Sequence, residues 1–399
     1  VTDIPRAFER IFDGCANDVA CSSVYPNARE DFAAAINNLR ANPPTLEVSL
    51  GDETVEMEVD STLALNAMFI GIYGHGYSAL PSQVNAYAEG DYSALRNIIP
   101  QLFSASDNAR VQHFAINCSD DPVSSLDQID LEDLPDYYQE IVLDDAWKLA
   151  NFCPMLDLPQ LDATSDEPLT ADVPVLLLQG GYDPATPVEG GNLVAEALPN
   201  SINAIFPAGT HIQVHDPCAL SIMDAFMTDP TTAPDTSCIN QEVTFAVPLD
   251  ATITSTDGDQ SLSLTLAPGY LESDAFGPLQ VFSSGQTKQI FGTIWDAGEQ
   301  PDARSSLQYI VDEILPWEIQ ESEFFEGDPV AGYPTQRLQA AVVDPAFGIP
   351  FPLDGIAFEN EGGRIFSLIF VTLNPGEVEA LRGSEIPATL ETVIVDGGG

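Results

Sequence analysis

Apolar residues recur three and four positions apart along much of the first 165 residues, which is the spacing of an amphipathic α-helix. Five segments follow this pattern: Ile4–Phe12, Ala28–Leu39, Leu63–Ile72, Pro81–Ala88 and Tyr92–Phe103. Two short strands are expected between the second and the third of them, at Thr45–Leu50 and Thr54–Val59. Residues 1–165 are therefore predicted to be a mainly helical region.

The pattern changes to strand, helix and strand within residues 166–240. Val173–Gln179 is an almost continuous apolar run, which suits a strand covered on both faces. A helix is expected next, with Thr186 as its N-cap, Pro187 at its first position and Glu189 completing a capping box. Ser201–Phe206 is the second expected strand.

Short runs typical of strands dominate the chain from about residue 241. The expected strands are Val243–Val247, Ser261–Leu266, Leu279–Phe282, Gln289–Ile294, Arg337–Val343, Gly355–Glu359 and Arg364–Leu373. Helices are expected at Ser305–Leu315 and Pro375–Arg382. We therefore expect residues 247–399 to form a separate α+β domain.

An aspartate and a histidine follow the two strands expected within residues 166–240. Asp183 comes just after the first strand, and His211 lies in the loop after the second. Because ligands bind at the carboxyl ends of strands in an α/β sheet, this order matches the last two members of a Ser-Asp-His triad. The alternative is that Asp183 serves only the turn before Pro184. His215 is the alternative base.

A serine nucleophile is not obvious, since no G-x-S-x-G motif is present. The nearest match is Gly76–Leu80, with Ser78 at its centre. Leu80 stands where the sharp turn at the nucleophile needs a small residue, and the preceding segment is helical in pattern. We therefore expect Ser78 to lie in a turn of the helical region. Val1 begins on a helical pattern without an initiator Met, which indicates a processed chain or a fragment.

The charge of the chain disfavours several classes of partner. Acidic residues number 62 and basic residues 12, giving a formal net charge of −50. Binding to nucleic acid or to anionic membranes is disfavoured because no basic surface is available for phosphates. No apolar run approaches the roughly 18 residues that a membrane-spanning helix needs. The acid excess either keeps the protein soluble or adapts it to high salt.

The six cysteines indicate disulfides and an oxidising, extracellular or cell-envelope location. Proximity suggests the pairs Cys15–Cys21, Cys118–Cys153 and Cys218–Cys238, although six cysteines allow 15 pairings. Free buried thiols in a cytosolic protein are the alternative. The spacings do not match those of zinc sites, and no metal site is expected.

Several segments together resemble α/β-hydrolase peptidases of the tripeptidyl aminopeptidase and proline iminopeptidase type. The segments that carry this resemblance are Arg6–Pro26, Phe114–Asp121, Pro174–Pro187, Ala208–His211 and Pro217–Cys238. The implied fold class is α/β: the C-terminal part of an α/β-hydrolase fold, with 1–165 as a helical cap and 166–240 as its last strands and helices. Residues 247–399 resemble the PsbP-like α/β/α group and form an appended domain.

The resemblance implies an exopeptidase that releases short peptides or residues from free N-termini without a cofactor. It gives Asp183 the role of triad acid and His211 that of base, with the nucleophile on a partner segment upstream of this chain. Asp120 and Asp121 fall where the family binds the substrate ammonium; the alternative is that they are solvated acids. The chain alone is then expected to be inactive. A carboxylic-ester hydrolase of the same fold and a non-catalytic, peptide-binding or partner-binding hydrolase remnant remain alternatives.

If the acid excess is an adaptation to high salt, screening of the self-repulsion stabilises the folded state. Thermal unfolding midpoints measured over a NaCl series are then expected to rise with salt concentration. A midpoint that does not rise contradicts the salt adaptation and leaves solubility as the role of the acidic surface.

Overall fold

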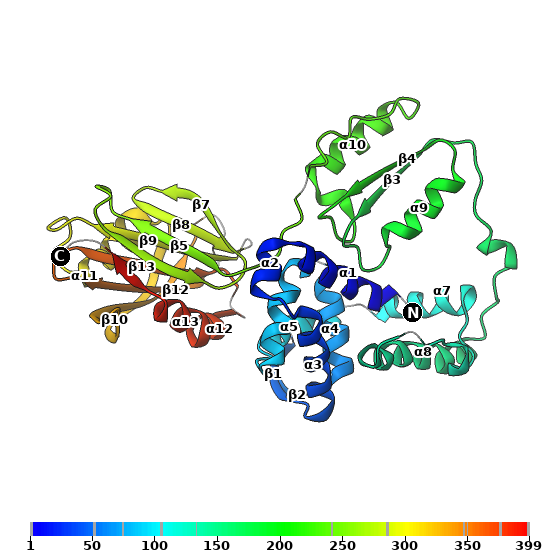
Figure 1. The fold of residues 1–399 in the computed structure, drawn as a ribbon, viewed down its shortest axis with the longest axis horizontal. Coiled ribbons are helices and arrows are strands. Elements are labelled where there is room, and N and C mark those ends of the chain that lie inside the picture. Colours follow the sequence, from blue (N-terminus) through cyan, green and yellow to red (C-terminus); the bar gives the residue numbers. More distant parts are fainter. Residues whose placement is uncertain are drawn as a thin grey trace. The chain divides into compact units, whose positions relative to one another are not determined.

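A computed structural model describes residues 3–50, 53–73, 76–103, 107–132, 134–240, 242–284, 287–345, 348, 350–374 and 377–396. The chain divides into two compact units, Val1–Phe245 and Ala246–Gly399. The first runs from blue to green in Figure 1 and the second from yellow-green to red. The three terminal glycines, 397–399, are predicted from the sequence to form a frayed tail, and they lie outside the described residues.

The first part of unit 1 consists of helices and one small hairpin. Its helices are α1 Asp3–Asn17, α2 Val19–Val24, α3 Ala28–Ala41, α4 Ser61–Tyr73, α5 Leu80–Ala88, α6 Leu95–Phe103, α7 Asp107–Asp120 and α8 Asp136–Leu156. The strands β1 Thr45–Leu50 and β2 Glu53–Glu58 pair antiparallel. The fully buried rings of Phe8, Phe12, Phe32 and Tyr138 pack together, which joins α1, α3 and α8.

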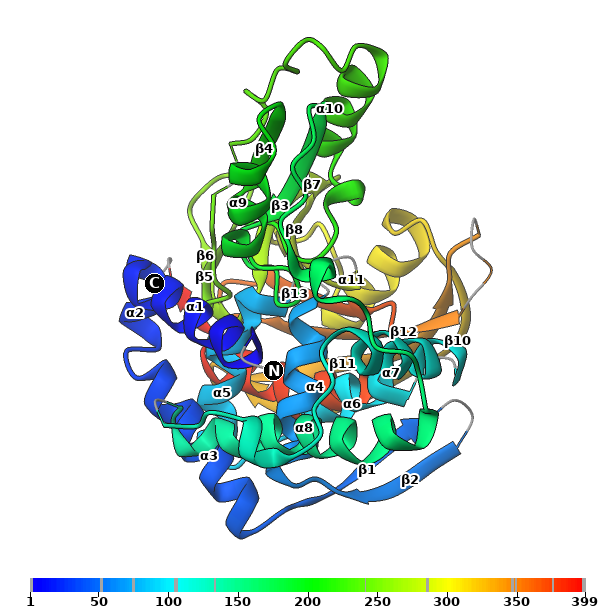
Figure 2. The same cartoon turned by 90° about the vertical axis from the view of Figure 1, so that its right-hand side faces the viewer.

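The second part of unit 1 is a parallel strand pair with one helix on each side. Its elements are β3 Val175–Gly180, α9 Val188–Ala197, β4 Ser201–Phe206 and α10 Pro217–Thr228. β3 and β4 pair in register from Val175↔Ser201 to Gly180↔Phe206. Both views place the strands between α9 and α10 (Figures 1 and 2). Because the strands are parallel, their carboxyl ends meet at one edge.

The start of α9 differs from the predicted capping box. The helix begins at Val188 with Pro187 as its N-cap residue, and no side chain caps it. The hydroxyl of Thr186 instead donates to the carboxylate of Asp183, and Glu189 forms an ion pair with Arg10. The predicted capping side chains are therefore engaged elsewhere, Thr186 by the preceding turn and Glu189 by a distant arginine.

Unit 2 is rich in sheet. Its strands are β5 Leu249–Thr254, β6 Ser261–Leu266, β7 Tyr270–Phe276, β8 Leu279–Ser284, β9 Lys288–Trp295, β10 Glu318–Val330, β11 Tyr333–Val343, β12 Pro350–Glu359, β13 Ile365–Thr372 and β14 Ile394–Asp396. The larger sheet has the order β10-β11-β12-β13-β9-β8-β7 and the smaller one β14-β6-β5. The helices are α11 Ala303–Tyr309, α12 Val378–Ala380 and α13 Ile386–Glu391.

The larger sheet is covered on both faces, so unit 2 has two hydrophobic cores. Every residue of β13 is buried, and its side chains alternate between them. Phe366, Leu368 and Phe370 face the smaller sheet, whereas Ile365 and Ile369 lie in the core with α11. A strand buried on both faces accounts for the continuous apolar run in this part of the sequence.

Two predictions for unit 2 are corrected by the structure. Residues 243–247, where unit 1 ends, form no strand, and Phe245 packs against the rings of Tyr77 and Tyr182 of the same unit. The helix expected at Ser305–Leu315 ends its regular part at Tyr309 and continues as a wider π-helical turn, Ile310–Ile314.

The six cysteines form three disulfides, which confirms the expected use of cysteine in this chain. The pairs are Cys15–Cys21, Cys118–Cys153 and Cys218–Cys238. They join α1 to α2, α7 to α8, and α10 to the segment that follows it. None of the helices in the described part of the chain is long and apolar enough to span a membrane.

Gly292 in β9 provides a test of the packing between the two sheets. A Cβ added there would lie 2.1 Å from Cδ1 of the fully buried Ile253. We expect Gly292→Ala to destabilise the protein by about 1–3 kcal/mol through overpacking. Gly383→Ala is the matched control, because a Cβ there meets nothing within 4 Å. Equal denaturant midpoints for the two variants would contradict this packing.

Candidate active site

The carboxylate of Asp183 is held in place by the turn that follows β3. Asp183 is only 7% exposed. Its Oδ1 accepts hydrogen bonds from the backbone N–H groups of Ala185 and Thr186, both at 2.8 Å. Its Oδ2 accepts the hydroxyl of Thr186 at 2.7 Å. Three hydrogen-bond donors from the same turn therefore hold both oxygens of the Asp183 carboxylate in place.

His211, in the loop after β4, meets this carboxylate through one ring nitrogen. Its Nδ1 lies 3.1 Å from each of the two carboxylate oxygens of Asp183. An ionised carboxylate only accepts hydrogen bonds, so Nδ1 carries the proton, and in the neutral ring Nε2 keeps a lone pair. No residue in the described part of the chain bonds Nε2. The ring can therefore accept a proton at Nε2 while Asp183 stabilises the resulting positive charge.

The Gly180-Gly181 pair lets the two turns approach closely enough for this contact. The backbone N–H of Gly181 donates to Phe206 O, and that of Tyr182 to Gly209 O, each at 2.8 Å. A Cβ on Gly180 would lie 2.2 Å from Thr210 O, closer than any real side chain allows. Glycine is therefore needed at the end of β3 for the aspartate turn to reach the histidine loop.

The histidine loop contains a backbone outlier directly after His211. Ile212 has φ of +68°, a conformation that costs free energy for a β-branched residue. The loop around it is tied down, because the buried side chain of Gln213 donates to the carbonyl of Thr210. Strain beside a histidine that faces a buried acid is typical of functional sites.

Tyr73, at the C-terminal end of α4, contacts His211 on a further side. The two ring centroids are 5.1 Å apart at an interplanar angle of 74°. Burial raises the pKa of the Tyr73 hydroxyl, and the nearby charge of Asp183 raises this pKa further. The helical part of unit 1 therefore supplies an aromatic wall to the Asp183–His211 pair.

Two further contacts attach the helices to the aspartate turn. Arg10 of α1 donates from Nη1 to Gly181 O at 2.8 Å. The rings of Tyr77 and Tyr182 stack with centroids 4.2 Å apart. Burial, together with the neighbouring hydroxyl of Tyr182, raises the pKa of Tyr77 to about 12. The sequence analysis missed Tyr73, Arg10 and Tyr77, since nothing local marks a contact with a turn more than 100 residues away.

The other candidate residues do not join this pair. Ser78 lies in the short 3₁₀-helix Gly76–Ala79, not between a strand and a helix, and it has no hydrogen bond to His211. His215 is exposed and has no contact with Asp183. Asp120 and Asp121 lie exposed at the end of α7 without bonds to other described side chains.

The two other histidines of the chain are His75 and His113. The ring of His113, on α7, contacts Phe114. His75 lies outside the described residues. Within the described part of the chain, no three His, Cys, Asp or Glu side chains are grouped so that they could hold a metal ion.

Residues 139–238 match the model of a protein family described as TAP-like protein, an α/β-hydrolase family. The matched region includes β3, α9, β4 and α10, and therefore Asp183 and His211. This match supports a hydrolase. No curated protein sequence matches the chain.

Solved structures similar to this chain include three of bacterial origin. Cyanobacterial PsbP (CyanoP) from Synechocystis sp. PCC 6803 is 11% identical, with 39% of this chain and 96% of that one covered and a TM-score of 0.27. LpqN, involved in cell envelope biogenesis of Mycobacterium tuberculosis, is 11% identical over 37% of this chain and 91% of its own, with a TM-score of 0.28. The protein of unknown function PA94 from Pseudomonas aeruginosa is 12% identical over 36% and 96%, with a TM-score of 0.21.

The contact between α4 and the candidate site can be tested through the titration of Tyr73. Removing the negative charge of Asp183 lowers the cost of ionising a neighbouring phenol. We therefore expect Asp183→Asn to lower the pKa of Tyr73, measured by NMR on ring-labelled tyrosine. Asp120→Asn is the control and should leave that pKa unchanged. An unchanged pKa in Asp183→Asn would place Tyr73 away from the carboxylate.

Proposed function

We propose that this chain is the C-terminal portion of a secreted serine hydrolase of the exopeptidase type, with His211 as general base and Asp183 as the acid that orients it. The observation that carries the proposal is the contact of His211 Nδ1 with a buried, fully bonded carboxylate, while no described residue bonds Nε2. The family match over the same residues supports a hydrolase. The three disulfides fit an oxidising compartment outside the cytosol.

The pair would act in acyl transfer as follows. His211 Nε2 takes the proton of a serine hydroxyl while the serine oxygen attacks the carbonyl carbon of the scissile bond. The tetrahedral intermediate collapses, the same proton passes from Nε2 to the leaving amine, and an acyl-serine remains. Water then repeats the sequence and releases the carboxylic acid. Asp183 stays ionised throughout and stabilises the imidazolium through Nδ1.

The serine would come from a segment that completes the β3–β4 sheet. Parallel sheets are normally wider than two strands and covered on both faces. Here four consecutive residues of β3 are only half-buried, and each strand pairs only with the other among the described strands. Leu193 of α9 is 68% exposed and Leu220 of α10 is 50% exposed. We infer that further parallel strands, one ending in the serine turn, cover these surfaces.

The exopeptidase assignment rests on the family resemblance, and Asp120 and Asp121 keep their proposed role as ligands of the substrate ammonium. Both carboxylates are exposed and available. Their neutralisation should raise KM for aminoacyl anilides with a free amine and leave N-acetylated anilides unaffected. Equal effects on the two substrates would assign these side chains to the solvated surface.

A fluorophosphonate probe tests the proposed base directly. We expect the product of the complete reading frame to be labelled at one serine, and His211→Ala to slow the labelling on the order of 10³-fold or more. His215→Ala is the matched control, because this exposed histidine lies four residues away and does not contact Asp183. It should be labelled at the normal rate.

Two results would overturn the proposal. One is labelling of the present chain at Ser78, since that serine would then be the nucleophile. The other is a complete reading frame without a serine turn motif, in which case the chain is a binding protein built on a hydrolase remnant. Preferential turnover of p-nitrophenyl esters over anilides would replace the peptidase by an esterase.

A further inference from the structure

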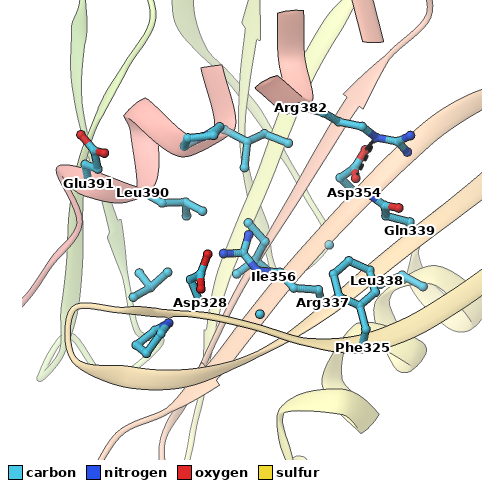
Figure 3. Close-up of a pocket in the computed structure, with 16 residues that line it drawn as sticks. Phe325, Asp328, Arg337, Leu338, Gln339, Asp354, Ile356, Arg382, Leu390 and Glu391 are labelled. Atoms are coloured by element: carbon cyan, nitrogen blue, oxygen red, sulfur yellow. Dashed lines mark hydrogen bonds and ion pairs between the residues drawn. The ribbon is translucent and has the colours of Figure 1, made fainter. Parts of the chain in front are cut away.

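Unit 2 contains a pocket of about 420 Å³ between the strands β10, β11 and β12 and the helix α13 (Figure 3). This volume falls within the roughly 300–1,000 Å³ of typical small-molecule sites. Val330, Ile356 and Ile386 belong to the core between the two sheets and form an apolar wall, and Leu390 of α13 lines the pocket beside them. The pocket therefore reaches from the surface to the hydrophobic core.

Arg337 of β11 is the unusual side chain in this lining. It is half-buried, and its guanidinium has no hydrogen bond or ion pair with any described residue. Burial lowers its pKa, although the charges of Asp328 and Asp354 oppose this effect. The chain has 62 acidic residues, so an arginine without a bonded carboxylate is not explained by a shortage of acids.

The other arginine that lines the pocket, Arg382, differs from Arg337 because it is hydrogen-bonded to a carboxylate. Arg382 donates from Nε to both carboxylate oxygens of Asp354, at 2.8 and 3.0 Å. Figure 3 shows this bonded pair and no bond to Arg337. Asp354 is therefore already engaged, and Arg337 is left to face the pocket.

Local backbone features hold Arg337 in this position. A Cβ on Gly327 would lie 2.4 Å from Nε of Arg337, so the arginine stem lies across a strand position that only glycine leaves open. Directly after Gly327, β10 loses register by one residue, and the hydroxyl of Thr335 donates to Asp328 O. Such bulges redirect side chains at sheet edges and are seldom accidental.

We propose that this pocket binds an organic monocarboxylate with an apolar body, its carboxylate on the Arg337 guanidinium and its body against Ile356 and Leu390. A planar guanidinium matches a carboxylate with two parallel hydrogen bonds. A dianion such as a phosphate ester is disfavoured, because Asp328, Asp354 and Glu391 also line the pocket. The inference concerns unit 2 alone and is independent of the proposed hydrolase activity.

Calorimetric titration of the full chain with hexanoate tests this site, with hexanamide as the isosteric neutral probe. We expect saturable binding of hexanoate and at least tenfold weaker binding of hexanamide. Arg337→Gln should weaken hexanoate at least tenfold, and Asp328→Asn should strengthen it by removing a repulsive charge. Arg304→Gln, on the exposed surface of α11, is the control and should bind like the parent chain.

Thermal stability distinguishes a ligand-binding role of Arg337 from a purely structural one. Because a half-buried, unpaired guanidinium has lost hydration without gaining a partner, Arg337→Gln should unfold at the same temperature as the parent or higher. Hexanoate should raise the midpoint of the parent and not that of the variant. Equal affinity for acid and amide, absence of saturable hexanoate binding, or full affinity in Arg337→Gln would each overturn the proposal.

Discussion

The contact between Asp183 and His211 depends on two backbone turns that lie closer together than side chains permit. Gly180, the last residue of β3, and Gly181 after it have no Cβ, so the aspartate turn donates backbone hydrogen bonds directly to the end of β4 and the histidine loop. Parallel pairing of β3 with β4 brings both turns to the same edge, and the helical part of unit 1 attaches there through Arg10 and the ring of Tyr73. If the two turns separated, the contact between Asp183 and His211 would be lost, together with the packing of the helices against it.

The sequence was most informative where a single element carried its own signal. The apolar run of β3, the Gly-Gly turn and the position of β4 are local properties, and they were enough to place Asp183 and His211 at one edge. The contact of Tyr73 with His211 could not be predicted in this way, since it joins residues far apart in the chain through packing of α4. The predicted cap of α9 was wrong for a different, local reason: the hydroxyl of Thr186 donates to Asp183, three residues before it, and does not cap the helix.

In unit 2, buried strands could be predicted from the sequence, whereas a strand with mostly exposed side chains could not. β13 is buried on both faces and was predicted from its apolar run, whereas β10 is an edge strand whose side chains are mostly exposed, so no alternating pattern marked it. Arg337 lies on the neighbouring strand, and its unpaired state emerges only from the packing of β10 and α13 around it. The sequence shows that this chain is poor in cations; only the structure shows that Arg337, half-buried in the pocket lining, has no bonded acid among the described residues.

The central claim is that a buried carboxylate holds the Nδ1–H of His211 and leaves Nε2 free to accept a proton. Proton NMR of the chain at neutral pH, with histidine labelled at both ring nitrogens, tests it most directly. The account predicts a downfield, exchange-protected Nδ1–H resonance that disappears in Asp183→Asn and persists in His215→Ala. Absence of this resonance, or its survival in Asp183→Asn, would contradict the proposed acid–base pair.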